Sequence, residues 1–127
     1  MSSPIMTLYH VTRESNWPFI SREGLVPGVG AISRMLTGAS QRPRIYFFTS
    51  LSDAQWFKRA AKQFFVQADL MEPEEELIIL AVDLAELKRR GIRVRKQDVL
   101  YHNIRQTKTE GSVTQPIPME LIKRLEG

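Results

Sequence analysis

The segment Glu76–Leu84 constrains the fold most, because six consecutive apolar residues lie between Glu76 and Asp83. A run of this length and composition predicts a strand that is buried on both faces, at the centre of a sheet. The chain has 127 residues, of which 43% are hydrophobic and 25% are charged, and this is the profile of one globular domain. We therefore expect a single domain over residues 1–127, with this strand in its core.

Two further strands are predicted in the first half of the chain. Residues 6–12 are rich in β-branched and aromatic side chains, and the alternation of a strand places Leu8, His10 and Thr12 on one face. Residues 45–49 form a short aromatic run that suits a buried strand. His10 is therefore expected on a strand rather than on a loop.

A short helix is predicted over Trp17–Glu23. Asn16 is its candidate N-cap, Pro18 fits the first turn, and Gly24 can end the helix in a left-handed conformation. Residues 25–44 then contain many glycines and prolines and little periodicity. We expect a long loop there, with one turn around residues 32–36, and loops of this length are often functional.

A second helix is predicted over residues 53–67, directly after the strand over residues 45–49. Ser50 and Asp53 have the spacing of a capping box. Apolar residues at spacings of three and four predict a stripe that faces the core, made of Ala54, Phe57, Ala61 and Phe64.

The second half is predicted to be mostly strands and turns. A helical turn is predicted over residues 85–90 and ends at Gly91, and strands follow over 92–96 and 99–104. A turn over 107–110 then leads to a strand over 112–115. A closing helix is predicted over 117–125, with Pro118 in its first turn. The order of elements favours an α+β fold over a doubly wound one.

Several classes of protein are excluded by what the sequence lacks. No apolar run approaches the roughly 18 residues that span a bilayer, and the N-terminus lacks the pattern of a signal peptide, so we expect a cytoplasmic protein without a membrane partner. The absence of cysteine excludes disulfides, thiol nucleophiles and cysteine-based zinc sites. No Walker loop or zinc-protease motif is present, and we expect no metal site.

Basic residues outnumber acidic ones, 18 against 14, which gives a formal charge of +4. This excess favours the approach of a polyanion or a phosphate-bearing ligand. The cluster over residues 88–96 is expected to place Arg93 and Arg95 on one strand face, where they could contact DNA or RNA phosphates. Alternation with Ile92 and Val94 explains the same cluster as a solvated face, and both interpretations stay open.

Three segments of the chain resemble the ADP-ribosyltransferase superfamily. The first is Leu8-Tyr-His-Val-Thr12 with Glu23-Gly-Leu-Val-Pro27, and it is similar to the opening strand and turn of DNA-modifying toxins of the DarT type and of tRNA 2′-phosphotransferases. The second is Arg44-Ile-Tyr-Phe-Phe-Thr-Ser50, followed by Asp53-Ala54. The third is the segment from Glu110 to Ile122, with its Ile-Pro-Met-Glu-Leu-Ile sequence. Together these segments cover most of the chain.

The resemblance implies a fold and a set of site residues. The fold is a small domain of two packed antiparallel half-sheets with flanking helices, which binds NAD between them. His10 would hydrogen-bond the ribose of NAD, Tyr46 would stack on the nicotinamide, and Glu110 would stabilise the cation that forms as nicotinamide leaves. The further residues that the resemblance assigns to NAD binding are Thr12, Gly24, Ser50 and Arg34, with Arg42 and Arg44 as alternatives to Arg34.

The function implied is transfer of ADP-ribose from NAD to a macromolecule, with nucleic acid favoured over protein as acceptor. Lys108 stands two residues before Glu110, where members that modify arginine carry Gln or Glu, so transfer to arginine is not expected. Three alternatives stay open: a degenerate domain that only binds a partner, an enzyme like tRNA 2′-phosphotransferase, and an NAD glycohydrolase. An antitoxin or a protein target is a further candidate partner.

Overall fold

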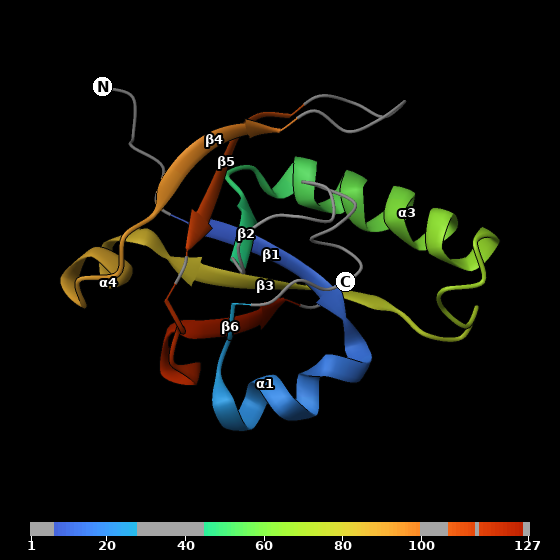
Figure 1. The fold of residues 1–127 in the computed structure, drawn as a ribbon, viewed down its shortest axis with the longest axis horizontal. Coiled ribbons are helices and arrows are strands. Elements are labelled where there is room, and N and C mark those ends of the chain that lie inside the picture. Colours follow the sequence, from blue (N-terminus) through green and yellow to red (C-terminus); the bar gives the residue numbers. More distant parts are fainter. Residues whose placement is uncertain (1–6, 28–44, 100–106, 114, 126–127) are drawn as a thin grey trace.

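The computed structural model describes residues 7–27, 45–99, 107–113 and 115–125, and it shows an α+β domain with one six-stranded sheet (Figure 1). The strand order is β4-β5-β2-β1-β3-β6, and every neighbouring pair is antiparallel. The strands are β1 (Thr7–Arg13), β2 (Ile45–Phe48), β3 (Leu77–Asp83), β4 (Arg95–Val99), β5 (Thr107–Val113) and β6 (Ile122–Leu125).

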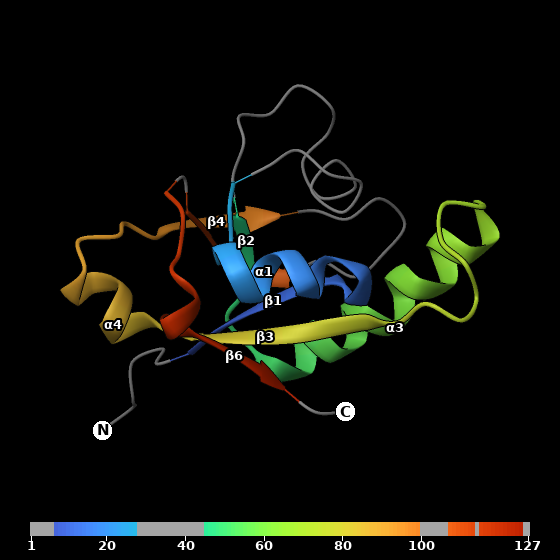
Figure 2. The ribbon, with the colours of Figure 1, turned by 90° about the horizontal axis from the view of Figure 1, so that it is seen from below.

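The helices cover both faces of the sheet and one end of it. They are α1 (Trp17–Glu23), α3 (Leu51–Gln67) and α4 (Leu84–Arg89), with 3-10 turns η1 (Glu14–Asn16) and η2 (Met119–Leu121). Ile20 of α1 packs in one apolar cluster with Leu8, whereas Phe57 of α3 packs in a second cluster with Val11. Because Leu8 and Val11 have opposite parity on β1, α1 and α3 lie on opposite faces of the sheet (Figure 2).

The apolar run near residue 80 forms the strand that its composition predicts. In β3 the side chains of Leu77, Ile78, Ile79, Leu80 and Val82 are buried. This strand pairs with β1 on one side, through seven residue pairs from Thr7↔Asp83 to Arg13↔Leu77, and with β6 on the other side. The predictions of a buried strand and of an α+β fold are confirmed.

The sheet consists of two parts that meet at one point. β1 and β3 pair along seven residues, whereas β1 and β2 pair only through Tyr9↔Phe48. In Figure 1, β2 and β5 run steeply across the direction of β1 and β3. One part therefore contains β4, β5 and β2, the other contains β1, β3 and β6, and the two strands that join them separate after the Tyr9↔Phe48 pair.

The predicted closing helix over residues 117–125 is wrong. Only residues 119–121 form a 3-10 turn, and Ile122–Leu125 form β6, whose Ile122 pairs with Val82 and whose Leu125 pairs with Ile79. Pairing with the edge of β3 satisfies the backbone of this segment and buries Ile122. Tertiary contacts thus override a helical pattern of only two turns.

Two shorter predictions in the second half are also corrected. Glu110 lies inside the seven-residue strand β5 and not in a turn. Arg93 precedes β4, which begins at Arg95, so the two arginines do not share a strand face as predicted. The backbone N–H of Arg93 donates to Oε1 of Gln115 (3.3 Å) instead of to a neighbouring strand.

The core-facing stripe of α3 ends on Phe65 and not on Phe64. Phe65 is 3% exposed and joins Ala54, Phe57 and Ala61 in the apolar cluster, whereas Phe64 is 48% exposed. A helix has about 3.6 residues per turn, so Phe65, four residues after Ala61, lies on the same face as Ala54. Phe64, three residues after Ala61, lies off that face. The helix itself begins at Leu51, two residues before the predicted start.

Some predictions lie outside the described residues, and these concern residues 28–44 and most of the predicted strand over 99–104. Arg34, Arg42 and Arg44 belong to this group. Within the described residues, no helix is both long enough and apolar enough to cross a membrane.

Candidate functional site

The strands that carry the three main site residues are direct neighbours in the sheet. His10 is on β1, Tyr46 on β2 and Glu110 on β5, and the strand order places β2 between the other two. Neighbouring strands lie about 4.8 Å apart, so the backbones of β1 and β5 are separated by roughly 10 Å. The sheet thus brings together residues that are 100 positions apart in the sequence.

The register defines how these residues line up. Glu110 pairs with Phe48, and Phe48 pairs with Tyr9, so the row of Glu110 meets β1 one residue before His10. Tyr46 pairs with Ser112. The backbone positions of Tyr46 and Glu110 are therefore close to β1 but offset from His10 along the strands. The row of Glu110 contains Phe48, which packs on the α3 face of the sheet, whereas His10 lies with Phe47 on the α1 face.

His10 is half-buried and packs on the face of the sheet that α1 covers. Its ring centroid lies 5.7 Å from that of Phe47, and the two ring planes are tilted by 60°. Phe47 is buried and pairs on its other side with Gly111, the residue after Glu110. The buried Phe47 ring therefore packs against one side of the imidazole.

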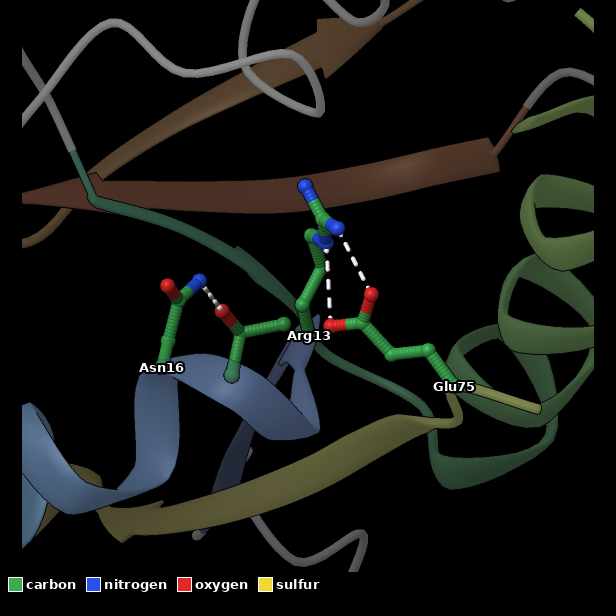
Figure 3. A network of polar contacts seen from close by, with 4 residues as sticks. Arg13, Asn16 and Glu75 are labelled. Carbon is green, nitrogen blue, oxygen red and sulfur yellow. Dashed lines mark hydrogen bonds and ion pairs between the residues drawn. The ribbon is translucent and has the colours of Figure 1, made fainter. Parts of the chain in front are cut away.

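Thr12 lies two residues beyond His10 and is 7% exposed, so its hydroxyl is a buried polar group. The side-chain amide Nδ2 of Asn16 donates to Oγ1 of Thr12 (3.0 Å; Figure 3). The sequence predicts Asn16 as the N-cap of α1, but its side chain makes no capping hydrogen bond. Asn16 instead fixes the orientation of the Thr12 hydroxyl at the end of β1.

Arg13 and Glu75 form a two-point ion pair beside Thr12 (Figure 3). Nε of Arg13 donates to Oε1 of Glu75 (3.2 Å), and Nη2 donates to Oε2 (2.6 Å). These hydrogen bonds, with a further one from Ser15, lower the pKa of Glu75 to about 2, and the same pair raises the pKa of Arg13. The pair ties the end of β1 to the loop that leads into β3.

Gly24, which the resemblance assigns to NAD binding, has a structural role in the described residues. Its φ of 78° and ψ of −168° lie in a region that is nearly exclusive to glycine, and an added Cβ would lie 2.2 Å from the carbonyl oxygen of Ile117. The next residue, Leu25, exchanges two backbone hydrogen bonds with Ile117 (2.9 and 2.8 Å). Gly24 therefore allows the segment after α1 to pack against the segment before η2.

Ser50 ends the connection from β2 to α3. Its hydroxyl accepts a hydrogen bond from the backbone N–H of Asp53 (3.4 Å) and shares another with the hydroxyl of Ser52 (2.8 Å). The capping box predicted from the sequence is thus confirmed on its serine side. Ser50 lies two residues after Phe48, so this helix start is next to the row that contains Glu110.

The sequence pattern does not predict that Arg13 and Asn16 organise this end of β1. Asn16 stands four residues after Thr12, a spacing that allows contact when a strand turns directly into a helix. Arg13 offered no comparable signal, because its partner Glu75 is 62 residues away. Such a long-range pair becomes visible only when β1 and β3 are aligned.

The described residues contain no group of three or more histidine and acidic side chains that could hold a metal ion. A scan against protein-family models found no match for this chain, and a search of curated proteins found no significant relative.

Proposed function

We propose that this protein transfers ADP-ribose from NAD to a macromolecular acceptor and releases nicotinamide. In this proposal His10, Tyr46 and Glu110 form the active site, and Thr12 is an additional NAD contact. Nucleic acid is the favoured acceptor. The proposal rests on the resemblance to the ADP-ribosyltransferase superfamily and on the arrangement of the segments that carry it.

One observation supports the proposal above all: the three resembling segments are adjacent in space. The first and second meet at Tyr9↔Phe48, and the second and third meet at Phe48↔Glu110. The first and third meet again where Leu25 pairs with Ile117. These segments are far apart in the sequence, and the sheet brings them to one place.

The proposed chemistry is displacement at the anomeric carbon of the nicotinamide ribose. The bond from C1′ to the pyridinium nitrogen breaks, and its electron pair leaves with neutral nicotinamide. A nucleophile on the acceptor then bonds to C1′ and loses its proton. Glu110 stabilises the positive charge on the ribose through its 2′-hydroxyl, His10 holds the ribose hydroxyls, and Tyr46 stacks on the nicotinamide ring.

The test is to incubate the purified protein with NAD, alone and with single-stranded DNA, RNA or a cell lysate, and to measure nicotinamide release and label transfer. We expect Glu110→Gln to reduce turnover by about 100-fold or more, since removing one preorganised charge-stabilising group has an effect of this size. The NAD turnover of His10→Ala is measured as a separate variant, because His10 is offset by one residue from the row of Glu110.

Glu120→Gln is the matched control, because it removes an exposed carboxylate that pairs with Arg90 and belongs to none of the strands β1, β2 and β5. If the Glu110→Gln variant turns over NAD as fast as the Glu120→Gln variant, the proposed role of Glu110 is rejected. Nicotinamide release to water alone, with no labelled acceptor, would make the protein an NAD glycohydrolase. Absence of NAD turnover with every acceptor would favour a binding domain.

A further inference from the structure

Charged residues are strongly segregated along this chain. Residues 88–96 contain six Lys and Arg and no carboxylate, whereas residues 68–76 contain five Asp and Glu and no Lys or Arg. The formal charge of the whole chain is +4, so the chain without residues 88–96 has a formal charge of −2. The basic character of the protein thus depends on one short segment.

The fold places these two segments at opposite ends of the molecule. The acidic segment follows the end of α3, and the basic segment begins in the last turn of α4. Figures 1 and 2 show α4 and the end of α3 at opposite ends of the longest axis. This arrangement keeps the acidic segment away from the basic one, which favours the approach of a polyanion at the α4 end.

Within the basic segment, the arginines differ in their partners. Arg89 pairs with Glu86, and Arg90 pairs with Glu120. Lys88 and Arg93 are exposed, and among the described side chains no carboxylate forms an ion pair with either of them. Among the described basic side chains of this segment, Lys88 and Arg93 therefore keep a charge that no ion pair neutralises.

The basic segment leads directly to the row of Glu110. It continues from Arg93 into β4, where Lys96 pairs with Gly111 and Gln97 pairs with Glu110. Gln97 is four positions after Arg93, which is at most about 14 Å of extended chain. A polyanion that contacts Arg93 would thus lie within a few phosphates of the proposed catalytic position.

We infer that the surface formed by Lys88 and Arg93 is a docking surface for the phosphate backbone of a nucleic acid. This inference rests on the proposed function in one respect, because it assigns the surface that would hold the favoured acceptor beside that site. The contacts are to phosphates and carry no base specificity.

A membrane surface fits this end of the molecule less well. Stable membrane docking requires apolar side chains that insert as well as basic charge. The large exposed apolar side chains of the described residues are Phe19, Val26, Leu51, Phe64 and Leu70. None of them is on α4 or between Lys88 and Arg93, so the charge here has no apolar anchor beside it.

The test measures binding of a fluorescein-labelled oligothymidylate by anisotropy over a series of salt concentrations. Lys88→Gln/Arg93→Gln is compared with Arg22→Gln/Arg59→Gln, which removes the same charge from exposed positions on α1 and α3. We expect the first variant to flatten the slope of log K against log salt by about 1.4, since each lost contact to a single strand contributes about 0.7. The control should leave the slope within error of the parent protein.

An equal loss in both variants would overturn the docking surface, because binding would then follow net charge alone. Equal binding of anionic lipid vesicles would also overturn it, and so would salt-sensitive self-association in light scattering that excludes the oligonucleotide. Circular dichroism checks that each variant is folded. Binding is measured without NAD, and NAD turnover is measured without nucleic acid, so either proposal can fail while the other survives.

Discussion

Arg13 and Glu75 contact each other through two hydrogen bonds, Nε to Oε1 and Nη2 to Oε2, across 62 residues of sequence. This pair closes the end of β1 onto the loop before β3, three residues beyond His10. The side chain of Glu75 is 16% exposed and that of Arg13 is 37% exposed, so solvent screens the pair only in part. The geometry of the candidate site at this end of β1 therefore depends on a charge that can be titrated.

We predict that Glu75→Gln lowers the free energy of unfolding by about 1–2 kcal/mol at neutral pH. The pKa of Glu75 is lowered from 4.5 to about 2 in the folded protein. The ionised carboxylate therefore stabilises the fold fully at pH values above its pKa in the unfolded chain. The difference from the parent protein should shrink as pH falls from 4.5 towards 2. Urea denaturation over this pH range measures it.

Glu72→Gln is the control for that series, because Glu72 is an exposed carboxylate on the same loop. A stability difference for Glu75→Gln that stays constant down to pH 2 would show that the ion pair contributes nothing to stability. Arg13→Ala should show the same pH dependence, since it removes the partner that lowers the pKa of Glu75.

Gly24→Ala and Gly91→Ala form a second, matched prediction. Both glycines have positive φ, 78° and 73°, so alanine is strained at either position. At Gly24 the new Cβ would also lie 2.2 Å from the Ile117 carbonyl oxygen, whereas at Gly91 nothing lies within 4 Å. We expect a loss of about 1 kcal/mol for Gly91→Ala and of more than about 3 kcal/mol for Gly24→Ala, measured by thermal or urea unfolding. Similar losses at the two sites would contradict this packing.

Much of the fold follows from local patterns that the sequence displays. The helix over Trp17–Glu23 and the strand at residues 45–48 have the predicted limits within one residue, because proline, glycine and serine mark their ends. The buried strand β3 is equally clear from its apolar run. These elements have strong local signals that no tertiary contact reverses.

The errors concentrate where neighbouring strands determine the structure. The segment Ile122–Leu125 has a helical pattern but pairs with β3, and Glu110 has turn-like neighbours but pairs with Phe48. The same is true of the site: the sequence predicts its residue types from a resemblance, but only the strand order places β2 between β1 and β5. The offset between His10 and Glu110 results from how β2 pairs with β1 and β5, and no local sequence pattern predicts that pairing.

A third prediction concerns the two phenylalanines at the end of α3. Phe65 is buried against the sheet and Phe64 is half exposed, although their rings contact each other at 5.8 Å. We expect Phe65→Ala to lower the free energy of unfolding by about 3–5 kcal/mol, because it leaves a cavity in the core. Phe64→Ala should cost less than about 1 kcal/mol. If Phe64→Ala lowers the free energy of unfolding by urea more than Phe65→Ala does, then α3 is rotated so that Phe64 faces the core.

The last prediction tests whether Thr12 contributes to NAD binding, as the proposed function requires. Thr12→Val keeps the shape of the side chain and removes the hydroxyl that accepts from Asn16. We expect the KM for NAD to rise about fivefold with kcat nearly unchanged, the signature of a lost ground-state hydrogen bond of about 1 kcal/mol. Thr12→Ser retains the hydroxyl and should restore the KM.

Ser21→Ala is the matched control for this change, because it removes a hydroxyl that donates only to the Pro18 carbonyl on the exposed side of α1. Asn16→Ala should raise the KM less than Thr12→Val does, since it frees the Thr12 hydroxyl without removing it. If Thr12→Val lowers stability but leaves the KM for NAD at the value of the Ser21→Ala control, then the Thr12 hydroxyl only joins β1 to α1, and the NAD contact must come from other residues of β1.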